Sequence, residues 1–193
     1  MTRYVCFNQS IDPVAVPLLT AEEFVKRYPN HRVELVKGVV KEVPMAGVEH
    51  GVVNSNFGYY LNDHVRRNNL GRVMDNDTHF ITRRNPDEIR GMDLAYISYA
   101  RLPRGPVPRG PLEVAPELIV EVRSPTDAWT DVFAKVEEYI QAGVGVVIVL
   151  DPEKKSASAC RLNVDQQDFH VGDTLTIPDV LPGFAVEVAR LFE

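Results

Sequence analysis

The chain has 193 residues, which is enough for one sizeable domain rather than two. Its residues are 45% hydrophobic and 25% charged, as in ordinary soluble globular proteins, and no apolar run is long enough to span a membrane. A net charge of −6 argues against a protein that coats nucleic acid through bulk electrostatics, although it leaves room for an enzyme with a local basic groove.

The beginning of the chain predicts an N-terminal arm over residues 1–19, with one short strand around residues 4–7, followed by a single domain over residues 20–193. This segment lacks the apolar core of a signal peptide, so we expect a cytoplasmic protein. Cys6 and Cys160 have no Cys or His companions at metal-binding spacing, and both are interpreted as reduced, buried thiols.

Three helices are expected in the domain, at residues 20–29, 47–69 and 129–141. The first begins with a capping-box pattern, in which Thr20 caps the helix and Glu23 completes the motif. The second is expected to bury a face formed by Val52, Phe57, Tyr60, Leu61 and Val65.

Strands are predicted before and between these helices. Lys37 and Gly38 separate two β-rich runs and predict a hairpin. A central sheet is expected to contain strands near residues 33, 40, 80, 94, 119 and 147, with the region around residue 80 divided into short strands at 72–75 and 78–82. Further strands are expected at 156–164, 169–171 and 174–177. The fold class is therefore α/β, with a mixed central sheet flanked by helices and a β-rich C-terminal part.

The stretch PELIVEVRSPTDAWTDVFAKVEEY, residues 116–139, combines a buried strand with a helix. Two-residue periodicity places Glu121 and Arg123 on one face of that strand. A carboxylate on a buried strand loses its hydration and needs a metal, a cation or hydrogen bonds in return. On the helix, Lys135 and Tyr139 form a polar stripe beside the apolar seam, so Lys135 is placed to lean back toward the strand.

A second candidate acid, Asp93, stands near the start of the apolar strand MDLAYI. If this strand pairs with the strand of Glu121, the two carboxylates converge on one hard cation, and oxygen-only ligation favours Mg²⁺ or Mn²⁺. The backbone carbonyl of Val122 is a further candidate ligand. Such a metal would activate water at a phosphodiester, and Lys135 would position or deprotonate the water or stabilise developing charge. The alternative is two unrelated acids and a surface lysine.

Three other features have two interpretations each. Glu34 lies on a predicted strand and is equally compatible with a solvent-facing strand acid. His50 lies in the first turn of the second helix, where a capping or surface role is the simpler interpretation. The Pro/Gly-rich loop at residues 101–116 suits either a phosphate clamp or a solvated loop, and its arginines are Arg101, Arg104 and Arg109.

Several motifs occur in a specific order: TAEEF, RVELVKGVV, the EHG that starts the second helix, MDLAYI, PELIVEVRSPTD, the K-x-x-x-Y helix, AGVGVVIVLDP and LPGF. Each is weak alone, but over about residues 20–192 they together resemble the Uma2 family of restriction-endonuclease-like proteins, in the PD-(D/E)XK nuclease superfamily. The resemblance implies a restriction-endonuclease-like mixed sheet, a divalent metal and DNA endonuclease chemistry. A homodimer is expected by analogy.

The resemblance also implies roles residue by residue. It implies a catalytic set formed by Glu34, Asp93, Glu121 and Lys135. It agrees with a metal site formed by Asp93, Glu121 and the Val122 carbonyl. It implies substrate contacts from His50, Arg123 and Tyr139.

The sequence departs from the family pattern at two positions. Met92 stands where proline usually precedes the first acid, and Arg123 stands where the superfamily has a lysine, two residues after the second acid. Arginine stays protonated and cannot act as a general base, although it could bind the scissile phosphate. The lysine role then falls to Lys135.

The leading hypothesis is a Mg²⁺- or Mn²⁺-dependent DNA endonuclease. In this hypothesis Glu34 adds a ligand or orients a water, and Arg123 and the loop arginines hold phosphates. A catalytically silent nucleic-acid-binding module on the same fold would retain DNA without nicking it. A third hypothesis is an assembly role, in which Asp93 and Glu121 merely pair with arginines.

Overall fold

The computed structural model describes residues 17–29 and 31–193, and within these only the backbone of residues 76 and 77. The strand expected at residues 4–7, the thiol of Cys6 and most of the expected arm therefore lie outside the described residues. Cys160 is a buried free thiol, as expected.

Helix α1 (Ala21–Arg27) begins with the predicted capping box. The Thr20 hydroxyl accepts a hydrogen bond from the Glu23 N–H at 3.2 Å, and the Glu23 carboxylate accepts one from the Thr20 N–H at 3.1 Å. A third helix-start donor, the Ala21 N–H, donates to Asp87 at 2.7 Å. These bonds fix the start of α1 on the turn that precedes strand β4.

The predicted hairpin is formed by β1 (Val33–Val36) and β2 (Val39–Glu42). It turns at Lys37 and Gly38, whose φ angles are 52° and 76°. Positive φ at both central residues is the turn geometry that matches strand twist. The hairpin packs against α1 in a small core that includes Phe24, Leu35 and Ile89.

Eight strands form one mixed sheet in the order β2-β1-β4-β5-β6-β7-β8, with β3 paired to β4 outside this path. Strands β5 and β6 pair in parallel, joined by a crossover through helix α3, and the other strand pairs described in this sheet are antiparallel. The remaining strands are β3 (Gly71–Arg83), β4 (Glu88–Ser98), β5 (Leu118–Val122), β6 (Val146–Asp151), β7 (Ser156–Arg161) and β8 (Val164–Phe169).

Strand β4 pairs with three other strands, β1, β3 and β5. One edge is paired with β3 over nearly its whole length. On the other edge β1 pairs at Ile89, and β5 pairs from Leu94 to Tyr96. Residues 90–93 therefore lie between two neighbouring strands that diverge from one another.

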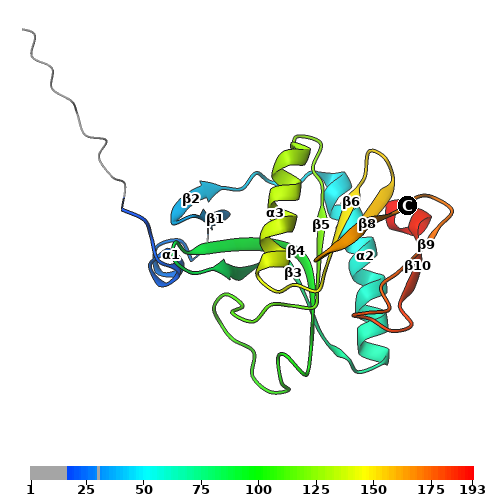
Figure 1. Ribbon diagram of the computed structural model, residues 1–193, viewed down its shortest axis with the longest axis horizontal. Helices are drawn as coiled ribbons and strands as arrows, with labels where there is room; N and C mark the ends of the chain where they lie inside the picture. The colour runs from blue at the N-terminus through cyan, green and yellow to red at the C-terminus, as the bar shows by residue number, and fades with distance from the viewer. Residues whose placement is uncertain (1–16, 30) are drawn as a thin grey trace, which may run out of the picture.

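The sheet has a helix on each face (Figure 1). Helix α2 (Val48–Arg67) packs on one face together with the small sheet of β9 (Thr174–Thr176) and β10 (Ala185–Glu187), and with the 3-10 helix η1 (Val188–Phe192). Helix α3 (Trp129–Gln141) packs on the other face. None of the helices in the described part of the chain has the length and apolar character needed to cross a bilayer.

Some expected details of these elements are wrong. The two short strands expected at 72–75 and 78–82 are one strand, β3, with a bulge between them. The strand expected at 169–171 is β8, which ends at Phe169. Val53, rather than Val52, is the first residue of the buried face of α2, and Val52 is 43% exposed. The buried positions repeat every four residues, at 53, 57, 61 and 65.

Candidate active site

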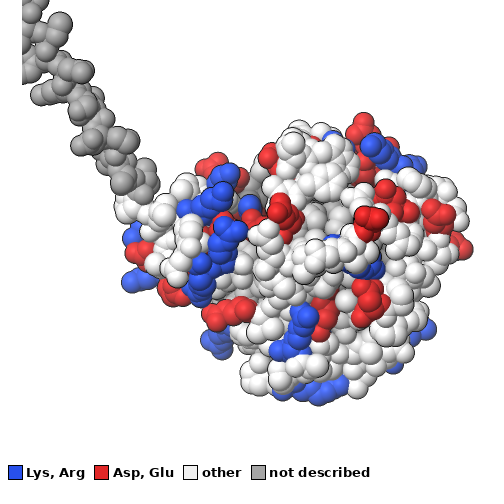
Figure 2. Space-filling model, in the orientation of Figure 1, with Lys and Arg blue, Asp and Glu red and all other residues white. Residues whose placement is uncertain are grey.

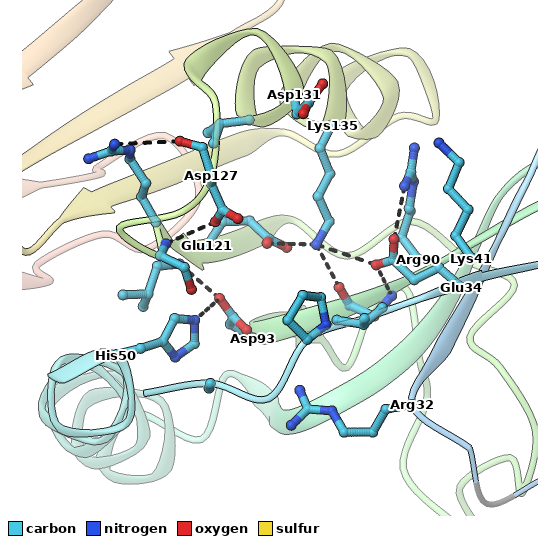
Figure 3. Close-up of a pocket in the computed structure, with 18 of the residues that line it drawn as sticks. Arg32, Glu34, Lys41, His50, Arg90, Asp93, Glu121, Asp127, Asp131 and Lys135 are labelled. Carbon is cyan, nitrogen blue, oxygen red and sulfur yellow. Dashed lines mark hydrogen bonds and ion pairs between the residues drawn. The ribbon is translucent and has the colours of Figure 1, made fainter. Parts of the chain in front are cut away.

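A pocket of about 300 Å³ lies where β1 and β5 diverge along β4 (Figure 3). The starts of α2 and α3 contribute to its wall. Strands β1 to β5 and helices α2 and α3 thus contribute lining residues that are far apart in the sequence. Its lining includes Glu34, His50, Asp93, Glu121, Val122, Arg123 and Lys135.

Gly91 lies on β4 between the residues that pair with β1 and those that pair with β5. Its backbone N–H and carbonyl are hydrogen-bonded by side chains instead of by a neighbouring strand. Its N–H donates to Glu34 Oε1 at 3.0 Å. Its carbonyl oxygen accepts from Lys135 Nζ at 3.0 Å and lies 3.2 Å from the Tyr139 hydroxyl. Side chains from β1 and α3 therefore satisfy backbone groups of a buried strand.

Glu121 is held by the two polar residues of α3. Lys135 Nζ donates to Glu121 Oε2 at 2.8 Å, and the Tyr139 hydroxyl donates to Oε1 at 2.9 Å. The predicted approach of Lys135 to the strand is therefore confirmed. Tyr139 is fully buried beneath the pocket, so its contact is with the carboxylate rather than with anything in the pocket.

The acid–base state of this pair follows from its burial. Burial raises the pKa of Glu121 to about 7; the Lys135 ammonium opposes this rise, and the nearby Asp93 carboxylate adds to it. Burial acts to lower the pKa of Lys135, but the surrounding carboxylates, Glu121 foremost, raise it well above its usual value. Lys135 is thus a charged hydrogen-bond donor here, which disfavours the expected alternative of a general base.

Asp93 lies beside Glu121 because β4 and β5 pair from Leu94 and Val120 onward. Its Oδ2 lies 3.1 Å from His50 Nε2 and accepts from the Val122 N–H at 2.8 Å. Burial alone would raise the pKa of Asp93, but His50 and Lys135 lower it overall. The interpretation of His50 as a mere surface or capping residue is wrong, because its ring faces this buried carboxylate.

Glu34 is only 9% exposed, so its interpretation as a solvent-facing strand acid is also wrong. Its Oε2 accepts from Arg90 Nη1 at 2.9 Å, and its Oε1 lies 3.5 Å from Lys135 Nζ. Burial acts to raise the pKa of Glu34, but the Lys135 and Arg90 charges lower it overall. Glu34 therefore enters the site as a carboxylate between two cations.

The sequence did not reveal Arg90. Its guanidinium also forms an ion pair with Glu138 of α3, in which Nη2 and Nε donate to Oε2 of Glu138 at 2.6 and 3.0 Å. The strand was expected at the apolar run MDLAYI, whereas β4 already begins at Glu88 and so includes Arg90. No local pattern marks Arg90, because its partners Glu34 and Glu138 lie 56 and 48 residues away in the sequence.

Arg123 lines the pocket, but its guanidinium is directed to other partners. It pairs with Asp151 at 3.4 Å and with Glu153 at 3.1 Å, and it lies 4.9 Å above the ring of Trp129. Asp151 is buried, so a cation beside it offsets the cost of its charge. The expected role of Arg123 in holding a phosphate is therefore not favoured.

The arginines of the 101–116 loop do not reach this site. Arg101 donates to the carbonyl oxygens of Ala115 and Pro116, and Arg104 bonds to Asn69 and stacks on Tyr99. The loop lies near the end of α3 opposite to the pocket (Figure 1), and none of its residues lines the pocket. Of the two interpretations of this loop, a phosphate clamp at the pocket is therefore not favoured, because Arg101 bonds within the loop and Arg104 bonds to Asn69 beside it.

The donors available to a metal ion are fewer than expected. Among the residues that the structure describes, no group of three or more His, Cys, Asp and Glu side chains is arranged to hold a metal. Glu34 does not converge with the other acids, because the Lys135 ammonium lies between it and Glu121. The remaining donors, Asp93 and Glu121 with the Val122 carbonyl, are all oxygens and fit a small divalent cation that keeps several waters.

Comparison with known proteins gives the family. No curated protein matches the chain. The crystal structure of "a putative nuclease belonging to DUF820 from Anabaena variabilis ATCC 29413" is similar, with a TM-score of 0.77 and 19% identity over 90% of this chain and 97% of that one, which shows a shared fold. The family model Uma2, described as "Putative restriction endonuclease", matches residues 21–189. This match spans most of the chain, and the chain therefore belongs to the Uma2 family of restriction-endonuclease-like proteins.

Proposed function

We propose that this protein is a divalent-metal-dependent DNA endonuclease that hydrolyses phosphodiester bonds. The observation that carries the proposal is the buried pair of carboxylates on neighbouring strands, Asp93 and Glu121, with the Lys135 ammonium 2.8 Å from Glu121 in an open pocket. Two acids and a lysine so arranged are the minimum for oxygen ligation beside a fixed positive charge. Membership of the Uma2 family supports the same reaction class.

Asp93, Glu121 and the Val122 carbonyl would hold the cation, and Mg²⁺ or Mn²⁺ suits this donor set. Burial raises the pKa of Glu121 to about 7, so this carboxylate gains from a further positive charge. A bound cation would offset the charge of the phosphodiester and favour loss of a proton from water.

The side chains around the acids have separate tasks. Lys135 keeps its proton at Nζ. Its ammonium would donate a hydrogen bond to a phosphate oxygen that gains negative charge beside Glu121 during the reaction. Tyr139 fixes the orientation of Glu121 from below, and His50 fixes that of Asp93. These contacts preorganise the acids, since each carboxylate has a partner that sets the direction of its free lone pairs.

The pocket mouth offers cations for a nucleic-acid backbone despite the negative net charge. Arg32 and Lys41 line it on the side of β1 and β2, whereas Asp127 and Asp131 line it on the side of α3. Figure 2 shows Lys and Arg side chains gathered over the hairpin, with Asp and Glu side chains facing them. We infer that the phosphate backbone lies against the hairpin side, where its charge is complemented.

The test is nicking of supercoiled plasmid in Mg²⁺ or Mn²⁺. Glu121→Gln and Lys135→Met are nearly isosteric, and each is expected to lower the rate by about 100-fold or more, the usual cost of losing a charge-stabilising or acid–base group. Glu117→Gln is the matched control, because Glu117 neighbours the same strand but bonds to Ser98 outside the pocket. Full activity in both site variants would assign the nicking to another site or to a contaminant.

A silent binding module is the second candidate, and one observation favours it. Arg123 stands where the superfamily lysine is expected, and its guanidinium is committed to Asp151 and Glu153. This candidate predicts metal-dependent retention of DNA with no nicking in any cation. Calorimetric titration with Mn²⁺ distinguishes both from an assembly role, which predicts no heat of binding.

A further inference from the structure

Arg90 forms the most extensively bonded ion pair of the pocket. Its Nη2 and Nε bond to Glu138 of α3 at 2.6 and 3.0 Å, and its Nη1 bonds to Glu34 of β1 at 2.9 Å. Glu138 also accepts a hydrogen bond from Thr82 of β3. One guanidinium on β4 thus connects the hairpin, the sheet and α3, and its planar fork suits this task in a way that an ammonium would not.

The charges in this region are limited in number. Arg90 and Lys135 are the cations that contact three buried or mostly buried carboxylates, Glu34, Glu121 and Glu138. Two further carboxylates beside them have other partners: Asp93 lies against His50, and Glu88, next to Glu138, pairs with Arg83. Lys135 Nζ lies 2.8 Å from Glu121 but 3.5 Å from Glu34, although both carboxylates are within its reach. The preference has a structural cause, because Glu34 already receives Arg90 on one oxygen and the Gly91 N–H on the other.

We propose that Arg90, braced by Glu138, is a positioning residue that satisfies Glu34 and thereby directs the Lys135 ammonium to Glu121. Without the Arg90 charge, Glu34 is left buried with one cation in reach, and an unpaired buried carboxylate is costly. Lys135 then moves toward Glu34 and away from Glu121. This role of Arg90 deepens the proposed nuclease function. Its effect on the reaction rate rests on that proposed function, whereas its effect on the position of Lys135 does not.

The decisive experiment is the crystal structure of Arg90→Gln without added metal. We expect Lys135 Nζ to lie closer to Glu34 than to Glu121, which reverses the order of 3.5 and 2.8 Å found here. Arg161→Gln is the matched control, because Arg161 forms a similar bidentate pair with Asp179 at the same 16% side-chain exposure but outside the pocket. This control is expected to leave both distances unchanged.

A folded Arg90→Gln variant in which Lys135 still bonds to Glu121 would overturn the inference. If this variant does not fold, Arg90→Lys gives the test, because a compact ammonium lacks the planar fork with which Arg90 bonds to Glu34 and Glu138 through separate nitrogens. The same displacement of Lys135 is then expected, and its absence counts equally against the inference.

The kinetic consequence separates the two proposals. If the wild-type protein nicks plasmid, Arg90→Gln is expected to lower kcat by about 10- to 100-fold with little change in KM, as for other residues that orient site ligands. Arg161→Gln is expected to leave kcat unchanged. If the wild-type protein does not nick plasmid, the nuclease proposal fails, whereas the Lys135 distances still decide the role of Arg90.

Discussion

Glu121 is the residue at which burial and charge compete most strongly. It lies on a fully buried strand, with an ammonium on one oxygen, a phenol on the other and the Asp93 carboxylate nearby. Burial favours its neutral form, and Lys135 favours its charged form. Such a site is poised to change its proton or its cation, which an ordinary structural ion pair is not.

This competition gives a pH dependence with a definite sign. The pKa of Glu121 rises from 4.5 to about 7 on folding, so between these values the folded state keeps a proton that the unfolded state has lost. Stability due to this group therefore falls as pH rises from 4.5 to 7, by on the order of 3 kcal/mol, and is constant above 7. We expect this fall to be absent in Glu121→Gln.

Urea unfolding at a series of pH values measures it. Glu34 and Asp93 have lowered pKa values, so their contributions are lost at acid pH and are common to both proteins. The difference between wild type and variant isolates Glu121. Parallel stability curves from pH 4.5 to 7 would contradict the raised pKa.

At the residue scale, the sequence predicted best where alternation within a strand marked an acid as buried. Asp93 and Glu121 were identified as acids in apolar strands and Lys135 from its polar stripe on the following helix, and the three lie close together as expected. Arg123 was misassigned, because strand periodicity gives the face of a side chain but not the partner of a long, flexible one. The partner of Arg123, Asp151, comes from a different strand, and such nonlocal pairings leave no local signal.

The hairpin of β1 and β2 is the element that delivers Glu34, and its turn depends on one glycine. Gly38 has φ of 76°, and a Cβ there would lie 2.6 Å from Leu18 Cβ. Gly38→Ala is therefore expected to cost about 1–3 kcal/mol of unfolding free energy, from the left-handed backbone and the clash together.

Thermal and urea denaturation test this expectation. Gly110→Ala is the control, because a Cβ at Gly110 meets nothing within 4 Å. The control should be within about 0.5 kcal/mol of the wild type. Equal unfolding free energies of the two variants would mean that Leu18 moves away from the added Cβ at little energetic cost.

At the element scale, prediction succeeded for long periodic segments and failed for polar ones. Helix α3 was predicted with the correct bounds, because its apolar seam repeats at helical spacing. Strand β8 was misplaced, because five of its six residues are exposed and VDQQDF has no apolar alternation. Strand β10 was missed because AVE is too short to show a period.

At the scale of the whole molecule, the net charge of −6 and a nucleic-acid substrate are compatible only through local cations. In Arg32→Gln/Lys41→Gln, each lost phosphate contact should lower the dependence of log affinity on log salt by about 1, and both together by about 2. The same change in Arg66→Gln/Arg67→Gln, at the far end of α2, should have no effect.

Fluorescence anisotropy with a short duplex measures these slopes, and the Glu121→Gln background prevents cutting. Weaker binding from both double variants alike would indicate a diffuse electrostatic attraction rather than a hairpin contact. Unchanged binding in the hairpin variant would place the phosphates elsewhere.

The fold class was predictable at this scale, since alternating helical and strand patterns indicate a mixed sheet with helices on its faces. The arrangement of strands was not. That β1 and β5 share one edge of β4 depends on which long-range pairing wins, and each strand alone is compatible with several neighbours.

This shared edge has a consequence for how the protein acquires its chemistry during folding. Glu34 and Lys135 are separated by about half of the chain, and they meet only when β1 and β5 have both docked on β4. Contacts between residues so distant in sequence form slowly, because the intervening loop must first be closed at an entropic cost. We therefore expect this cluster of charges to form late in folding, after both strands have docked on β4.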